Sequence, residues 1–159
     1  MKFAVTVFYI LGFLGLGYGQ HVNSIKLVDL EKRITNDTDT LYIVNFWATW
    51  CVPCVKELPA FDSIQAAYAD KNVKVLLVSL DFKEDLESKL LPFIANKKVK
   101  SEVVLLDETD ANYFIPRISK EWSGAIPATL LQNNRKKTTA FFEKKLNYAF
   151  LKTEIEKIQ

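Results

Sequence analysis

Three short apolar runs, separated by segments with helical periodicity, most constrain the fold that this chain can adopt. The runs are rich in branched and aromatic residues, which is typical of buried strands, and they span 41–47, 73–82 and 102–107. After the first run, apolar residues recur at spacings of three and four, which predicts an amphipathic helix from Val52 to about Asp70. A second helical segment follows the second run, and we expect Pro92 to kink or restart it. This alternation indicates an α/β protein, with a mixed central sheet and helices on both faces.

The C-terminal third has a different pattern. We expect a short helix over residues 113–122, and residues 127–142 predict two strands joined by a turn at Asn133 and Asn134. A last helix is expected to begin at Asn147, a residue type that caps helix N-termini well. Its apolar residues are predicted to face inward, and they are Tyr148, Leu151, Ile155 and Ile158.

The N-terminal segment has the layout of a secretory signal peptide. Lys2 precedes an apolar run over residues 3–16, and the small residues Gly17 and Gly19 follow it. We therefore expect cleavage after Gly19, which divides the chain into a signal peptide of residues 1–19 and one domain of residues 20–159. The alternative is an uncleaved anchor, but a spanning helix needs roughly 20 apolar residues. The predicted location is the periplasm or another extracytoplasmic space.

The charge balance argues against two classes of partner. The chain carries 21 Lys and Arg residues against 19 Asp and Glu residues. Such a balance predicts no nucleic-acid partner and no membrane-surface partner. Basic runs at 96–100 and 135–137 are most simply solvated surface.

Cys51 and Cys54 are the only two cysteines of the chain, and they stand where the first strand gives way to its helix. A structural zinc site needs four ligands, and the chain adds only His21 to these two thiols, so we predict no metal. An inert disulfide across so small a loop would contribute little stability. Redox chemistry fits better, because the N–H groups and dipole of a helix N-terminus stabilise a thiolate at Cys51. The predicted site needs no cofactor beyond a redox-active disulfide between Cys51 and Cys54.

Three stretches resemble the thioredoxin superfamily and, within it, the exported TlpA/ResA-like thiol–disulfide oxidoreductases. They are "NFWATWCVPC" (45–54), "KELP" (56–59) and "GAIPATLL" (124–131). The resemblance covers essentially all of residues 20–159, in the order of elements as well as in motifs. It implies a thioredoxin fold.

The resemblance also implies roles for the residues around the cysteines. Cys51 corresponds to the attacking thiol and Cys54 to the resolving thiol. Pro53 corresponds to the motif proline, which suits a first helical turn because it lacks an N–H. Trp50 would form an apolar wall for an incoming substrate, although an ordinary core position is the simpler alternative.

A second set of implied roles concerns the loop before residue 128. Pro127 matches the family's cis proline, which lies against the disulfide, and the backbone of Ile126 would pair with an extended substrate segment. Gly124 is expected to supply an unusual backbone dihedral. The alternatives are a trans proline and a plain turn.

Two polar residues bear on proton transfer. Asn45 stands where cytosolic thioredoxins carry a buried aspartate, and an amide cannot titrate, so that proton-accepting role does not carry over. Glu57 matches an acidic position typical of the TlpA/ResA-like branch and could take the proton of Cys54. The alternative for Glu57 is a surface residue in a lysine-rich first turn.

The residues between the cysteines indicate the direction of the reaction. Val52 and Pro53 provide no cation to favour the thiolate, and Glu57 opposes it, so we predict a reductant or near-neutral exchanger. Its partners would be protein thiols and disulfides such as exported apoproteins, with electrons from a membrane donor. The alternatives are a disulfide-forming oxidase and a non-catalytic client-binding module. A peroxidase is less favoured because Ala48 stands where the peroxiredoxin pattern has threonine.

Overall fold

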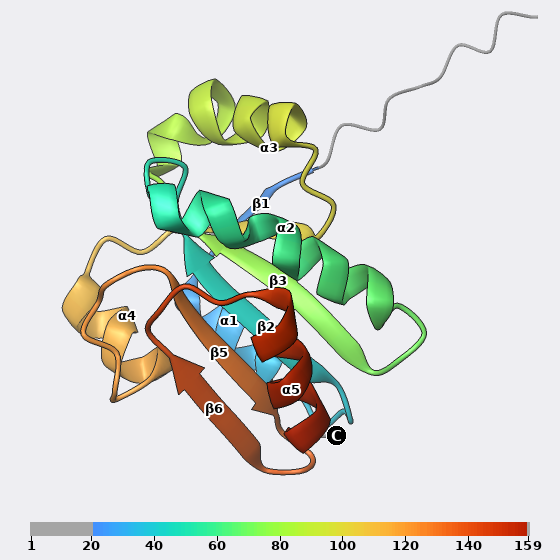
Figure 1. The fold of residues 1–159 in the computed structure, drawn as a ribbon. Helices are drawn as coiled ribbons and strands as arrows, with labels where there is room; N and C mark the ends of the chain where they lie inside the picture. The colour runs from blue at the N-terminus through green and yellow to red at the C-terminus, as the bar shows by residue number, and fades with distance from the viewer. Residues whose placement is uncertain (1–20, 159) are drawn as a thin grey trace, which may run out of the picture.

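The structure, a computed structural model, describes residues 21–158 and is built around one six-stranded sheet (Figure 1). The strand order is β1-β4-β3-β2-β5-β6. The first four strands in this order run parallel, and β5 and β6 are antiparallel to their neighbours β2 and β5. The strands are β1 (Asn23–Ile25), β2 (Leu41–Trp47), β3 (Val73–Ser79), β4 (Glu102–Leu106), β5 (Ala128–Asn133) and β6 (Thr138–Phe142).

Helices cover both faces of the sheet, as predicted, and Figure 1 shows α1 behind the strands and α2 in front of them. The helices are α1 (Leu27–Ile34), α2 (Val52–Ala67), α3 (Leu91–Lys97), α4 (Ala111–Ile118) and α5 (Tyr148–Ile158), with short 3-10 and π turns η1 (Lys83–Asp85) and η2 (Leu86–Leu90) before α3. All seven residues of β2 are buried, because helices lie against both of its faces.

The alternation of side chains along β2 divides the core into two parts. Leu41, Ile43 and Trp47 pack with apolar residues of α2, α3 and α5, whereas Tyr42, Val44 and Phe46 pack with α1 and α4. Successive side chains of a strand point to opposite faces, so Asn45 points toward the α2 side. This placement decides the surroundings of the redox site.

The elements predicted from the sequence are present with shifted ends. The β3 strand ends at Ser79 rather than at residue 82. The turn between β5 and β6 occupies residues 134–137 instead of Asn133 and Asn134, since Asn133 still pairs with Thr138. Lys137 takes a positive φ of 53° in that turn.

Two helices begin where the sequence predicts. Pro92 does stand at a restart, because η2 is a π-helical turn and α3 begins at Leu91. A wider turn accommodates a ring that lacks an N–H and crowds the preceding carbonyls. In α5 the cap at Asn147 is confirmed by its side-chain oxygen, which accepts from Phe150 N at 2.9 Å. Tyr148, predicted to face inward, is instead 39% exposed because it lies at the helix start.

The N-terminal part of the domain was not foreseen. β1 and α1 fill residues 23–34, and β1 pairs with β4 at the edge of the sheet. The spacing of Leu27, Leu30 and Ile34, all buried, was the available signal for α1. The predicted signal peptide of residues 1–19 lies outside the described residues. Within residues 21–158, none of the helices has the length and apolar character needed to cross a membrane.

Candidate active site

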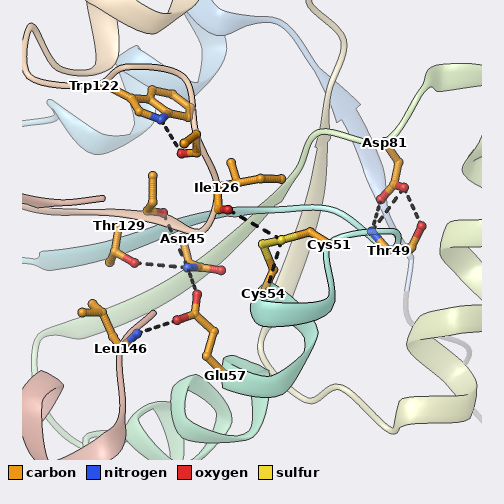
Figure 2. Close-up of a disulfide and its surroundings, with 12 residues drawn as sticks. Asn45, Thr49, Cys51, Cys54, Glu57, Asp81, Trp122, Ile126, Thr129 and Leu146 are labelled. Atoms are coloured by element: carbon orange, nitrogen blue, oxygen red, sulfur yellow. Dashed lines mark hydrogen bonds between the residues drawn. A yellow bond between two sulfur atoms is a disulfide. The ribbon is translucent and has the colours of Figure 1, made fainter. Parts of the chain in front are cut away.

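Cys51 and Cys54 form a disulfide at the junction between β2 and α2 (Figure 2). Cys51 occupies the N-cap position of α2, and the backbone N–H of Cys54 points at its Sγ over 3.4 Å. Cys51 is 6% exposed and Cys54 is fully buried. The two sulfur atoms are therefore unequal, since an incoming group reaches Cys51 first and an N–H of the helix can stabilise a thiolate there.

The loop before β5 lies directly against this disulfide. The Ile126–Pro127 peptide bond is cis, which confirms the predicted geometry of that bond. The carbonyl oxygen of Ile126 lies 3.8 Å from Cys51 Sγ, as Figure 2 shows. Gly124 has a φ of +98°, so the expected unusual dihedral is also present. The structure thus brings two distant segments together at one sulfur atom.

Side-chain contacts hold the same loop in place. Trp122 Nε1 donates to the carbonyl oxygen of Ala125 at 2.8 Å. The carboxylate of Glu143 accepts from the backbone N–H groups of Ser123 and Ala125, each at 3.0 Å. These bonds, and the one from the Ser123 hydroxyl, hold the pKa of Glu143 below its usual range. A loop fixed at both sides keeps the Ile126 carbonyl at a constant position beside the disulfide.

Apolar side chains at the edge of the site face outward. Trp50 is 65% exposed, so its alternative as an ordinary core residue is wrong. Val52 is exposed to a similar degree, and Pro53 is exposed in the first turn of α2. Exposed aromatic and branched residues beside a reactive atom are typical of a surface that binds another molecule.

Asp81 is a site residue that the sequence reasoning missed. Its carboxylate accepts from the backbone N–H of Thr49 at 3.0 Å and from the Thr49 hydroxyl at 2.6 Å. Ser79 Oγ donates to it as well, at 2.7 Å. Asp81 therefore ties the turn before Cys51 to the end of β3. A single acid near the end of the apolar run 73–82 was the only signal for it.

Glu57 is buried beneath the disulfide rather than exposed, so its surface alternative is wrong. Its side chain is 1% exposed and both oxygens accept hydrogen bonds, Oε1 from Asn45 Nδ2 at 2.8 Å and Oε2 from the backbone N–H of Leu146 at 2.7 Å. Burial raises the pKa of Glu57 to about 7, although these two bonds and the charge of Lys145 lower it. The carboxyl group can therefore exist in both protonation states near neutral pH.

Asn45 connects Glu57 with β5. Its Nδ2 group donates to Thr129 Oγ1 at 3.1 Å as well as to Glu57, and the Ala128 carbonyl oxygen lies 3.5 Å away. Figure 2 shows the amide between Glu57 on one side and Cys54 on the other. Thr129 and Leu146 were not foreseen, because they come from segments more than 80 residues away in sequence.

The reactive groups of the site are the two sulfur atoms and the Glu57 carboxyl group. Among residues 21–158, His, Cys, Asp and Glu side chains do not gather into any group of three that could hold a metal ion. The arrangement combines a sulfur atom that a partner can reach, a buried second sulfur and a buried carboxyl group. Such a set can exchange a disulfide with another molecule and move a proton at the buried end.

A family model described as the AhpC/TSA family matches residues 18–140. Curated relatives include the "Thiol-disulfide oxidoreductase ResA" of Oceanobacillus iheyensis, 39% identical over 37% of this chain and 27% of the relative. The "Sporulation thiol-disulfide oxidoreductase A" of Bacillus subtilis is 38% identical over 40% of this chain and 38% of the relative. These matches span well under half the length of either relative.

Solved structures share the fold over a larger part of the chain. A thiol:disulfide interchange protein from Bacteroides sp. has a TM-score of 0.58 and 27% identity over 75% of this chain and 72% of that one. A thioredoxin-related protein from Neisseria meningitidis serogroup B has a TM-score of 0.65 and 21% identity over 76% of this chain and 86% of that one. The predicted thioredoxin fold is thereby confirmed.

Proposed function

The chain belongs to the AhpC/TSA family, and from that premise we propose that it is a thiol–disulfide oxidoreductase acting on protein disulfides through Cys51 and Cys54. The observation that carries the proposal is the Cys51–Cys54 disulfide at the N-terminus of α2, with the Ile126 carbonyl against its more accessible sulfur. The relatives named as thiol-disulfide oxidoreductases support it. So do the exposed Trp50 and Val52, which offer an apolar surface to a polypeptide.

The proposed reaction begins with the dithiol form. The Cys51 thiolate attacks a sulfur of the substrate disulfide, one substrate thiolate leaves, and a mixed disulfide forms at Cys51. The Cys54 thiolate then attacks Cys51 Sγ and releases the second substrate sulfur as a thiolate. Two electrons pass to the substrate, and the protein ends in the disulfide state. The extended substrate segment lies along the backbone of Ile126 and against Trp50.

Glu57 is proposed to accept the proton that Cys54 loses before its attack. The two residues are three positions apart on α2, so their side chains are neighbours on one helix face. A carboxyl group with a pKa of about 7 suits this exchange, because it takes and returns a proton near neutral pH. A negative Glu57 also opposes the Cys54 thiolate and so favours the protonated thiol between turnovers.

The proposed direction is reduction or near-neutral exchange, in an exported protein. No cation stands between the cysteines, since Val52 and Pro53 occupy those positions. Electrons would come from a membrane donor, and exported apoproteins would be the substrates. A disulfide-forming oxidase and a client-binding module are the rival functions.

The test is insulin reduction by the pre-reduced protein. We expect turnover by the natural chain and none by Cys51→Ser, while Cys54→Ser should accumulate a mixed disulfide with the substrate. Equal activity of Cys51→Ser and the natural chain would refute the catalytic role. A redox titration followed by tryptophan fluorescence decides the direction, and a potential close to that of strong oxidants such as DsbA (about −120 mV) would favour the oxidase.

A further inference from the structure

One buried polar atom at the site has no partner in the disulfide state. Asn45 is fully buried, and no donor among residues 21–158 lies within hydrogen-bond distance of its Oδ1. Buried acceptors of this kind are rare in folded proteins, and each requires an explanation. By contrast, the Nδ2 group of the same amide donates both of its hydrogen atoms, to Glu57 and to Thr129.

The neighbours of Asn45 fix the orientation of the amide. Glu57 Oε1 can only accept when the carboxyl group is charged, so it requires the Nδ2 side of the amide at 2.8 Å. Turning the amide over would place two acceptors, Oδ1 and Oε1, against each other. With Glu57 charged, the Oδ1 atom therefore has to point away from it, and Figure 2 shows Oδ1 directed toward Cys54.

We propose that Asn45 is a positioning residue whose Oδ1 accepts a hydrogen bond from the Cys54 thiol once the disulfide is reduced. This inference rests on the proposed function, since it concerns the dithiol form of the same site. Reduction by a dithiol breaks the Sγ–Sγ bond and adds two electrons and two protons to Cys51 and Cys54. The new S–H group of Cys54 then provides the donor that Oδ1 lacks in the disulfide.

The hydrogen bond has a definite effect on the redox equilibrium. In the disulfide state a buried acceptor is left unsatisfied, which is unfavourable, and in the dithiol state it is satisfied. This difference shifts the equilibrium toward the dithiol. Asn45 therefore makes the protein easier to reduce and holds the Cys54 proton in place until Glu57 removes it.

Infrared spectroscopy of the S–H stretch tests the contact directly. In a Cys51→Ala chain, Cys54 is the only thiol and gives a single S–H band. We expect that band at a lower wavenumber than a free thiol, because the thiol donates a hydrogen bond. Asn45→Leu, which removes the acceptor, should move it to the free position.

Thr129→Val is the matched control, because it removes a partner of Nδ2 without touching Oδ1. It should leave the band unshifted. In chains with both cysteines, equilibration with dithiothreitol should show Asn45→Leu shifted toward the disulfide by about threefold or more. If Asn45→Leu does not fold, the band of the Cys51→Ala chain with Asn45 intact still decides, since a free-thiol position there contradicts the inference.

The outcomes separate the inference from the function on which it rests. A shifted S–H band in a protein that fails to reduce insulin would remove the proposed function and leave the contact standing. A free-thiol band in the presence of Asn45 would overturn the inference even if insulin is reduced. A shift of the Asn45→Leu equilibrium toward the dithiol would overturn it as well.

Discussion

Replacing the buried Glu57 by glutamine should remove a large part of the pH dependence of stability. The pKa of Glu57 rises from 4.5 to about 7 on folding, mainly through burial. The folded protein therefore binds more protons than the unfolded chain between these two values, and its stability falls as pH rises through that window. At about 1.4 kcal/mol for each pKa unit, the loss amounts to about 3 kcal/mol and is essentially complete above pH 7.

Comparing the natural chain with Glu57→Gln isolates the contribution that ionisation of Glu57 makes to the pH dependence of stability. Glutamine cannot ionise, and it places an amide N–H2 group against one of the two donors, Asn45 Nδ2 or Leu146 N, that now bond to the carboxylate. That mismatch costs about 1–3 kcal/mol and does not depend on pH. Carboxylates with lowered pKa values, such as Glu102, affect both proteins equally and cancel in the difference.

Urea unfolding of both oxidised proteins, followed by tryptophan fluorescence from pH 4 to pH 8.5, gives the measurement. We expect the natural chain to lose about 3 kcal/mol relative to Glu57→Gln across the series, with most of the change before pH 7. A constant gap between the two curves would mean that Glu57 titrates at an ordinary pKa. That result would also remove the argument for Glu57 as the proton acceptor.

Two further predictions concern the framework around the site. Gly124→Ala should destabilise the protein by about 1–3 kcal/mol in thermal or urea unfolding, because φ is +98° and the new Cβ would lie 2.9 Å from Ile115 Cδ1. Adding Ile115→Val removes the contacting atom but not the dihedral strain, so a full rescue would contradict the strain argument. Arg33→Gln should lower the free energy of unfolding by about 1 kcal/mol at pH 7, after allowance for solvent screening. Arg33 makes two bonds of 2.6 and 2.7 Å to Glu102 and lowers the pKa of that carboxyl group to about 2. The stabilisation by the Arg33–Glu102 pair is complete above pH 4.5 and is lost as pH falls through about 2. Lys74→Gln should cost less stability, because Lys74 makes a single 3.1 Å contact to Glu102. If the loss of stability in Arg33→Gln does not shrink in acid, the ion pair is not its cause.

The central part of the fold was accessible from the sequence because its signals are local. Buried strands of a parallel sheet produce continuous apolar runs, and β2 is an example with every residue buried. By contrast β1 has three residues, of which two are exposed, so its sequence carries no strand pattern. Its place in the sheet depends on pairing with β4, which no local signal reports.

In the candidate site, too, the local features could be predicted from the sequence and the non-local contacts could not. The spacing of Cys54 and Glu57 predicts that both lie on one side of α2 next to Cys51, and Figure 2 shows both side chains on that helix near the disulfide. The burial of Glu57 was not readable, because it depends on β2 and on the segment before α5. Asn45 was interpreted only as the loss of a titrating group. Its position between Glu57 and Cys54 depends on the packing of β2 against α2.

The pairing of β5 with β2 affects which contacts Cys51 can make while the chain is being synthesised. Ile126, which faces Cys51, lies 75 residues further along the sequence. When the two thiols leave the ribosome, β2 still has an open edge, and the wall beside Cys51 has not yet been made. A truncated chain that stops before residue 126 keeps both cysteines but lacks the loop beside them. The environment of Cys51 described here is thus expected only in a chain that has been translated beyond residue 127.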